Sequence, residues 1–381
     1  MLAGALFLGG LPTASGAIHN LFVGNLFTPA NIHALEFNDE THAFKLVQTH
    51  PADASHAWIS FDHAKRNIYG VSLNAPRISS YHVTSPTSLT LTRNSTASGA
   101  CTNKTSAFIQ AMPSPPYHVF SASWPASSCG MSLSVDWNGT LDKVLGTWTY
   151  PNGSGVHGLA FGEVRGETVM YSADLNGDSV WTHLVDKDTG AVEEVGRLKV
   201  MEGSHPRHLT VRSKAARYLY VLMEADNSVG MFDLDAATGM AVTEVERFSL
   251  VPDGVNNTLY WSAEVMLSKS EKYLWATARA KRGSSESGWI SAFLLADDGR
   301  VVKRMFMIPT STVGGWANAI SPAGFSDEYA AMTDYPTGYV EMFKMEGGVE
   351  TEDGLVYETA RSVGKVEIAD GGCCANVIWY S

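Results

Sequence analysis

The chain has 381 residues, of which 45% are hydrophobic and 17% charged, and its formal net charge is −12. This hydrophobic content suits a large buried core. The negative charge argues against a nucleic-acid partner, whose phosphates require a basic face, and against a membrane held by electrostatics alone. An anionic substrate would have to be bound by a few local arginines against an unfavourable overall field.

The first seventeen residues, MLAGALFLGGLPTASGA, are apolar and then small, with Ser15 and Ala17 placed as at a signal-peptidase site. The positive start of a signal is missing, because the first basic residues are Lys45 and Arg66. We interpret residues 1–17 as a possible signal peptide or its remnant, with an ordinary N-terminal tail as the alternative. Residues 18–381 then form a single domain, and no segment approaches the length of a transmembrane helix.

A short aromatic-bearing strand pattern returns about every fifty residues. Its anchors are Tyr69, Phe120, Tyr171, Tyr220, Trp275 and Ala331. A repeat of this length made of short strands is typical of β-propellers, with one blade per unit. Two unmatched halves, at 21–24 and 377–380, would form a seventh unit when joined. The sequence therefore predicts an all-β, seven-bladed β-propeller with one blade closed by N- and C-terminal strands, which leaves no free edge in the ring.

Within a unit such as 158–195, four short strands alternate with Asp, Asn and Gly turns, as one blade requires. The stretch 85–116 departs from this rhythm and is rich in Ser and Thr. We expect it to be an elaborated loop between two blades, partly ordered by a disulfide. Covering one mouth of the channel is a functional option for such a loop.

The four cysteines are Cys101, Cys129, Cys373 and Cys374. An even count suggests two bridges, for which three connectivities exist. A bond between the adjacent Cys373 and Cys374 would be strained, so we expect each to pair with Cys101 or Cys129. A metal site is disfavoured, because neither a Cys-x-x-Cys motif nor a nearby histidine pair accompanies them.

Five glycosylation sequons agree with a secretory route. They start at Asn94, Asn103, Asn138, Asn152 and Asn256. With the even cysteine count, they predict a glycosylated protein of the secretory pathway or the extracellular space.

Polar residues at the ends of the inner strands are the candidates for chemistry. His157, Arg207, Glu224 and Arg279 fall near equivalent mouths of neighbouring blades. Two arginines and a glutamate that converge there would cost several kcal/mol if buried without a partner or ligand. The structural alternative is an ion pair between blades formed by Arg207 and Glu224, with His157 as a satisfied core histidine.

At these residues the chain resembles the fungal carboxy-cis,cis-muconate cyclases, which belong to the seven-bladed lactonase propellers. The resemblance extends from His19 to Tyr380. It is carried by Trp-Ile-Ser-Phe-Asp-His-Ala-Lys-Arg-Asn-Ile-Tyr-Gly (58–70), His-Gly-Leu-Ala-Phe (157–161), Tyr-Ser-Ala-Asp-Leu (171–175), His-Pro-Arg (205–207), Leu-Met-Glu-Ala (222–225), Arg-Ala (279–280), Asn-Ala-Ile-Ser-Pro (318–322) and Asn-Val-Ile-Trp-Tyr (376–380).

The resemblance implies that His157, Arg207, Glu224 and Arg279 form the active site. The family reaction adds a carboxylate across a conjugated alkene to make a five-membered lactone. The two arginines would bind carboxylates and stabilise the enolate-like charge that develops. His157, or Glu224 polarised by its arginine, would donate the proton to carbon. The resemblance implies no metal and no organic cofactor.

The chain departs from the family where we expect Gly-Gly-His-Ser-Asn, because residues 314–318 read Gly-Gly-Trp-Ala-Asn. Trp316 replaces a polar side chain with a large flat ring, which favours a larger, less charged, unsaturated substrate. Packing of Trp316 between blades is the alternative. We expect Trp316, Asn318 and His205 to contact the substrate.

We therefore predict a cyclase that closes an oxygen-containing ring on an unsaturated, carbonyl-bearing metabolite without a cofactor. This prediction includes a pericyclic ring closure of the hetero-Diels–Alder type. The first alternative is a carboxymuconate lactonising enzyme or lactonase, and the second is a non-catalytic secreted glycoprotein that acts as an adhesin or surface antigen. The expected partner is a small-molecule substrate, with no nucleic acid or membrane, and the protein is expected to be a monomer or a weak homo-oligomer.

Overall fold

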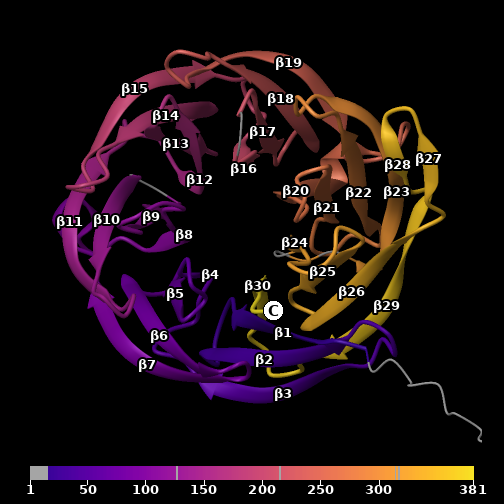
Figure 1. Ribbon diagram of the computed structural model, residues 1–381, viewed down its shortest axis with the longest axis horizontal. Coiled ribbons are helices and arrows are strands. Elements are labelled where there is room, and N and C mark those ends of the chain that lie inside the picture. The colour runs from indigo at the N-terminus through magenta and orange to yellow at the C-terminus, as the bar shows by residue number, and fades with distance from the viewer. Residues whose placement is uncertain (1–15, 126–127, 214–215, 314, 316–317) are drawn as a thin grey trace, which may run out of the picture.

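Seven four-stranded antiparallel sheets surround a central channel in the computed structural model (Figure 1). The structure describes residues 16–125, 128–213, 216–313, 315 and 318–381. The prediction of an all-β, seven-bladed propeller is confirmed. Within these described ranges the only helical elements are the 3₁₀ turns η1 (Gly99–Cys101) and η2 (Asn257–Leu259).

Each blade is written here from its innermost strand outward. The closing blade is β30 (Cys373–Trp379), β1 (Ile18–Asn25), β2 (Asn31–Asn38) and β3 (Phe44–Pro51). The second blade is β4 (Trp58–Phe61), β5 (Asn67–Val71), β6 (Arg77–Ser85) and β7 (Ser88–Thr96). The third is β8 (Ser106–Ala111), β9 (Val119–Ser123), β10 (Cys129–Val135) and β11 (Leu141–Thr149).

The remaining blades keep the same inside-to-outside order. The fourth is β12 (Val156–Val164), β13 (Glu167–Asp174), β14 (Ser179–Val185) and β15 (Val192–Lys199). The fifth is β16 (Pro206–Val211), β17 (Tyr218–Met223), β18 (Ser228–Leu234) and β19 (Ala241–Ser249). The sixth is β20 (Tyr260–Leu267), β21 (Tyr273–Ala280), β22 (Ser287–Leu295) and β23 (Val301–Val313). The seventh is β24 (Ile320–Pro322), β25 (Tyr329–Asp334), β26 (Tyr339–Glu346) and β29 (Thr359–Glu367), with an added hairpin of β27 (Val349–Thr351) and β28 (Gly354–Val356).

The repeating aromatic pattern corresponds to the second strand of each blade. In β17, the sequence Tyr-Leu-Tyr-Val-Leu-Met is buried at all six positions, because the blade packs against a neighbour on both faces. A strand that is buried on both faces reads as a continuous apolar run rather than an alternating one. The outer strand β19 is instead largely exposed along its length. The hydrophobic core therefore lies between the blades.

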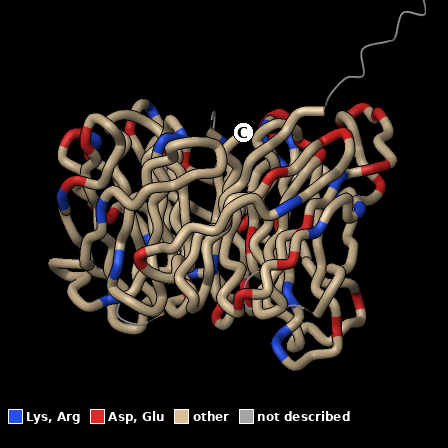
Figure 2. Tube along the Cα trace, turned by 90° about the horizontal axis from the view of Figure 1, so that it is seen from below, with Lys and Arg blue, Asp and Glu red and all other residues tan. Residues whose placement is uncertain are grey.

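The ring closes as predicted from the two unmatched half-units. β1 and β30 are antiparallel, with Leu21 opposite Trp379 and Val23 opposite Val377. Figure 1 shows the indigo and yellow ends of the chain side by side in this blade. Seen from the side, the ring is a squat cylinder with acidic and basic positions interspersed over it (Figure 2).

The expectation of a long loop over 85–116 is wrong. The stretch contains β7, the outer strand of one blade, and β8, the innermost strand of the next, and residues 97–105 connect the two. β7 lies at the rim of the ring and is exposed or half-buried at every position, so its sequence is polar apart from Leu89 and Leu91 and carries no continuous apolar run.

The expected disulfide pairing is also wrong. Cys101 pairs with Cys129, with their Cα atoms 5.6 Å apart, and Cys373 pairs with its neighbour Cys374 across a cis peptide. The first two cysteines lie in the core between the second and third blades, and the last two in the core between the seventh and closing blades. These two cores are separate, so no bridge between them forms.

The described residues include no helix long and apolar enough to cross a membrane. Four of the sequon asparagines are exposed and Asn138 is half-buried, so glycosylation stays a prediction. Most of the possible signal segment lies outside the described residues, and the first strand begins at Ile18. The domain boundary at residue 18 also stays a prediction.

The two disulfides differ in the length of chain that they close. Replacing Cys101 and Cys129 by Ala opens a loop of 28 residues and should lower the free energy of unfolding by about 3–4 kcal/mol. Replacing Cys373 and Cys374 opens no loop between distant residues and should cost much less. Denaturant unfolding of both double variants tests this difference, and equal losses would contradict it.

Candidate functional site

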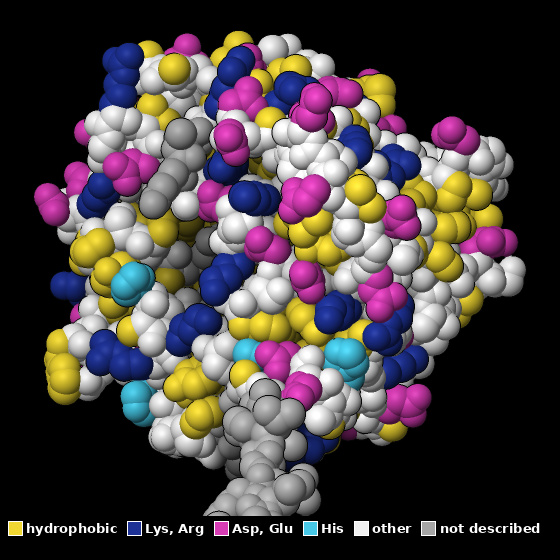
Figure 3. Space-filling model, turned by 45° about the vertical axis from the view of Figure 1, so that its right-hand side comes forward, with side chains coloured by type: hydrophobic (Ala, Val, Ile, Leu, Met, Phe, Trp, Pro, Cys, Tyr) yellow, Lys and Arg dark blue, Asp and Glu magenta, His cyan; other side chains and the backbone are white. Residues whose placement is uncertain are grey.

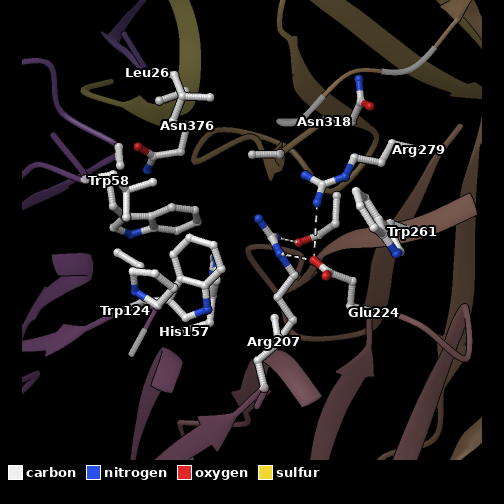
Figure 4. A pocket seen from close by; sticks show the side chains of 18 of the residues that line it. Leu26, Trp58, Trp124, His157, Arg207, Glu224, Trp261, Arg279, Asn318 and Asn376 are labelled. Atoms are coloured by element: carbon white, nitrogen blue, oxygen red, sulfur yellow. Dashed lines mark hydrogen bonds and ion pairs between the residues drawn. The ribbon is translucent and has the colours of Figure 1, made fainter. Parts of the chain in front are cut away.

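A cavity of about 880 Å³ lies at the end of the ring where the innermost strands begin and the second strands end. It contains His157, Arg207, Glu224 and Arg279, so the structure brings the four predicted catalytic residues together (Figure 4). A volume in this range is typical of small-molecule sites. On the face shown in Figure 3, acidic, basic and hydrophobic side chains are interspersed, whereas the charged residues that line the cavity are Arg207, Glu224, Arg279 and Lys281.

One residue from each blade lines the floor of this cavity, at a spacing of 50 or 56 residues. These positions are Ala57, Ala107, His157, Arg207, Ala263, Ala319 and Ala375. Five of the seven are alanine, which leaves room for a ligand in the centre of the ring. Only His157 and Arg207 carry functional groups on this floor.

Four of these floor residues sit in irregularities of the innermost strands. The pairing register shifts around Ala107 in β8, around His157 in β12, after Pro206 in β16 and around Ala263 in β20. Such bulges re-aim a side chain and are frequent beside functional sites. A bulge thus occurs in the innermost strand of four consecutive blades, and in two of them it directs His157 and Arg207 toward the cavity.

Glu224 is shared by two arginines. Arg207 Nε lies 2.9 Å from Glu224 Oε2 as an ion pair without hydrogen-bond alignment, and Arg279 Nη2 donates a hydrogen bond to the same oxygen at 3.2 Å. Arg207 Nη1 also donates to the carbonyl of Ala263. Arg207 and Glu224 belong to one blade, so the predicted pair between blades is instead formed by Arg279 and Glu224.

This arrangement leaves positive charge unpaired. Arg279 is only 5% exposed, and its Nε and Nη1 have no hydrogen-bond partner among the described residues. Burial and the charge of Arg207 lower the pKa of Arg279, while Glu224 opposes that shift. A second anion beside the two guanidinium groups would satisfy these donors and offset the cost of their burial.

A hydrogen-bonded chain runs behind the cavity from His157. Its Nδ1 lies 3.0 Å from Nε2 of His208, and Nδ1 of His208 lies 2.7 Å from Glu264 Oε2. Burial, followed by the charge of Arg207, holds the pKa of both histidines well below the usual range. Burial raises the pKa of Glu264 to about 8, against the charge of Arg207 and the N–H of Val265.

The cavity walls are largely apolar and aromatic. Trp58 and Trp124 stand on the His157 side, and Trp261 stands beside Arg279 on the other (Figure 4). Trp124 meets the His157 ring edge-on, with centroids 5.4 Å apart, and Lys281 lies 4.6 Å above the Trp261 ring. The cavity therefore combines a localised positive region with broad aromatic surfaces.

The three predicted substrate contacts have different outcomes. His205 lines the cavity, with its backbone at φ 57° and its N–H bonded to Asp178. Asn318 also lines it, but its amide donates to Asp334 Oδ2 at 2.8 Å and holds the start of the seventh blade. Trp316 lies outside the described residues, as does Ala317, so the expectation built on that departure stays a prediction.

Sequence reasoning missed His208, Glu264 and the tryptophans at 58, 124 and 261. His208 directly follows Arg207, and in a regular strand the two side chains would point to opposite faces. The bulge in β16 removes that alternation. The spacing of the floor positions is a sequence signal for His208 and Glu264, because each directly follows one of these positions.

In the described part of the chain, no three His, Cys, Asp or Glu side chains gather as metal ligands would. The cavity instead offers guanidinium groups, an imidazole and aromatic faces. These groups can bind a carboxylate, stabilise developing negative charge and transfer a proton.

Comparison with known proteins agrees with this geometry. Residues 20–315 match the family described as "Lactonase, 7-bladed beta-propeller". The chain belongs to this family. It is 33% identical to the carboxy-cis,cis-muconate cyclase of Neurospora crassa over 95% of this chain and 99% of that protein. It is 27% identical to muconate cycloisomerase 1 of Cutaneotrichosporon cutaneum over 51% of this chain and 53% of that protein.

The fold is shared more widely than the sequence. The periplasmic gluconolactonase of Pseudomonas aeruginosa superposes with a TM-score of 0.75 at 17% identity, over 95% of this chain and 99% of that one. A likeness at this identity concerns the fold alone. The chain is thus a lactonase-family propeller homologous to a carboxy-cis,cis-muconate cyclase, which is an isomerase-type cyclase.

The buried carboxyl of Glu264 should make stability depend on pH. Its folded pKa of about 8 exceeds the ordinary value of 4.5, so the native state holds more protons between these pH values. Wild-type stability therefore falls as pH rises through this window, by at most about 1.4 kcal/mol per pH unit. Glu264→Gln lacks this loss, so its stability relative to wild type should rise from pH 5 to pH 8.

Urea unfolding at several pH values measures this difference. Glu341→Gln is a matched control, because Glu341 is also buried but lies in β26, outside the cavity lining. A Glu264→Gln difference that stays constant with pH would contradict the prediction.

Proposed function

We propose that the protein is a cyclase that closes an oxygen-containing ring by adding a substrate carboxylate across a conjugated double bond of the same molecule. The observation that carries this proposal is the pair of buried arginines that share one glutamate and face His157 across the cavity. The homology to a carboxy-cis,cis-muconate cyclase supports it.

The chemistry assigns each group a role. A carboxylate oxygen forms the new C–O bond, and the π electrons move toward the carbon beside a second carbonyl or carboxylate. Arg207 and Arg279 stabilise the enolate-like charge that develops there, with Arg279 supplying the unpartnered N–H groups. His157 then donates a proton to that carbon through Nε2, because its Nδ1 is occupied by His208. The step consumes one proton, since a carboxylate becomes a neutral ester.

The lining supports a particular class of substrate. Glu224 already neutralises one of the positive charges of Arg207 and Arg279, so this pair calls for one anionic group. Around it stand Trp58, Trp124 and Trp261. The proposed substrate is an unsaturated carboxylic acid with an apolar or aromatic body, less charged than a small tricarboxylate.

Arg279→Met tests the charge that carries the proposal. It should lower kcat/KM on an accepted unsaturated carboxylate by about 10²–10³-fold, because it removes the donors aimed at the developing charge. Arg217→Met is a suitable control, since Arg217 is exposed and does not line the cavity. Carboxy-cis,cis-muconate and a dienoic acid with an aromatic substituent are the first substrates to assay. If neither binds in calorimetry, the non-catalytic alternative replaces this proposal.

A pericyclic closure is the second candidate, favoured by the three tryptophan faces around the cavity. The two reactions differ in whether a carbon-bound hydrogen of the product comes from solvent. In heavy water, the lactonising reaction places solvent deuterium on a product carbon, whereas a hetero-Diels–Alder closure places none. His157→Asn should abolish the first reaction and only slow the second. Mass spectrometry of the product therefore decides between them.

We also propose that the protein enters the secretory pathway. The two disulfides and the four exposed sequon asparagines support this placement. Expressed in a eukaryotic secretory host, the protein should lose mass on endoglycosidase treatment. A variant with all five sequon asparagines changed to Gln should show no shift. An unglycosylated, non-secreted wild type would overturn this placement.

A further inference from the structure

His208 and Glu264 form a second layer directly behind the cavity floor. Both side chains are almost fully buried, and they continue the hydrogen-bonded line that starts at His157. Gly158 permits this approach, because a Cβ at that position would lie 2.8 Å from the carbonyl of Arg207 and 2.9 Å from Cδ2 of His208. Trp58 meets the His208 ring edge-on, with centroids 4.8 Å apart. The imidazole is therefore held in place on two sides.

We propose that Glu264, His208 and His157 form a proton relay that delivers one proton from Glu264 to the substrate carbon through Nε2 of His157. This inference rests on the proposed lactonising reaction and assigns its acid. Glu264 is the proton source and His208 a positioning residue that transmits the proton, while His157 touches the substrate.

The relay has two arrangements of protons on the same heavy atoms. When Glu264 is protonated, it donates to Nδ1 of His208, Nε2 of His208 donates to Nδ1 of His157, and Nε2 of His157 carries a proton toward the cavity. When Glu264 is ionised, both hydrogen bonds reverse and Nε2 of His157 presents a lone pair. Loss of a proton from Nε2 to carbon, with a shift along each hydrogen bond, converts the first arrangement into the second.

This transfer leaves both histidines neutral before and after the step. The charged groups that face them are Arg207 from β16 and Arg279 from β21, and the counter-ion Glu224 lies on the arginine side. Burial first, and then the charges of the two guanidinium groups, disfavour an imidazolium here, so both histidines have low pKa values. Glu264 faces His208 and the charge of Arg207, and burial still raises its pKa to about 8. Near neutral pH the available proton therefore resides on Glu264.

The proton that Glu264 loses in each turnover is replaced from the side of the channel that lies away from the substrate cavity. The channel continues as a second cavity of about 320 Å³, which is lined by His208 and Glu264 among the innermost strands. The first cavity is lined by His157. Glu264 thus lies between the imidazole pair and a space that can supply protons from solvent. The cycle balances, because one C–O and one C–H bond form, one π bond is lost, and solvent restores one proton to Glu264.

Glu264→Gln tests the relay, since Gln keeps the shape but cannot supply the proton. With carboxy-cis,cis-muconate or another accepted unsaturated carboxylate, wild-type kcat should fall as pH rises through about 8. In the variant, kcat should fall by about 10²-fold and lose this alkaline decline, while KM changes little because the arginines remain. Glu341→Gln should keep both the rate and the pH profile. An unchanged rate and profile in Glu264→Gln would overturn the relay.

A measurement without substrate separates the relay from the proposed function. Infrared difference spectra of the wild-type protein should show a buried protonated carboxyl that ionises with a midpoint near pH 8. Nitrogen NMR should show the histidine tautomers reversing over the same range. If both occur and no unsaturated carboxylate is cyclised, the proposed function fails, while the exchange of a proton between Glu264 and the two histidines stands. If the carboxyl is already ionised at pH 6, the relay fails even when Glu264→Gln does not fold.

Discussion

The geometry of the innermost strands is the constraint on which the site depends. Seven blades bring seven equivalent residues to one level of the channel, and a side chain of ordinary size at every position would fill it. Alanine at 57, 107, 263, 319 and 375 keeps the centre open. The bulges around His157 and Arg207 then direct two functional groups into the space that the alanines leave. The cavity and its chemistry thus follow from the same ring of positions.

Electrostatics explains why this site is built for a ligand rather than for stability. Arg207 and Arg279 are both buried and share the single carboxylate of Glu224. Replacing such buried ionic groups by apolar ones usually costs nothing and often stabilises a fold. A ring that could be packed with aliphatic side chains instead retains a cluster with unsatisfied donors. Binding of an anion would supply the missing counter-charge.

Much of the architecture was predictable because it depends on local patterns that repeat. The second strands are buried on both faces, so runs such as Tyr-Leu-Tyr-Val-Leu-Met recur and reveal the number of blades. The strand β7 was not recognised, because it lies at the rim, where none of its positions is buried and most of its residues are polar. The disulfides were assigned wrongly because pairing depends on which core each cysteine enters, and the sequence does not state this for Cys101 or Cys373.

The candidate catalytic residues that line the cavity were predictable from the sequence, but the residues behind them were not. His157, Arg207, Glu224 and Arg279 were found through strand ends and a family resemblance, and the structure places them in one cavity. His208 and Glu264 were not predicted, because bulges interrupt the alternation of side chains between the two faces of the strands β16 and β20. Trp58, Trp124 and Trp261 come from three different blades and meet only when the ring closes.

Placing His208 and Glu264 behind the cavity lining removes a conflict between two requirements on the residues that line the cavity. A cavity with tryptophan walls suits an apolar substrate, whereas an acid placed directly on those walls would have to remain protonated beside two arginines. In the proposed relay, the carboxyl of Glu264 lies behind the imidazoles, where burial favours its protonated form, and His157 is the relay residue that lines the substrate cavity. The histidine pair separates the acid from the arginine cluster without carrying charge itself. The wall residues are therefore free to match the shape of the substrate, because none of them has to supply the proton.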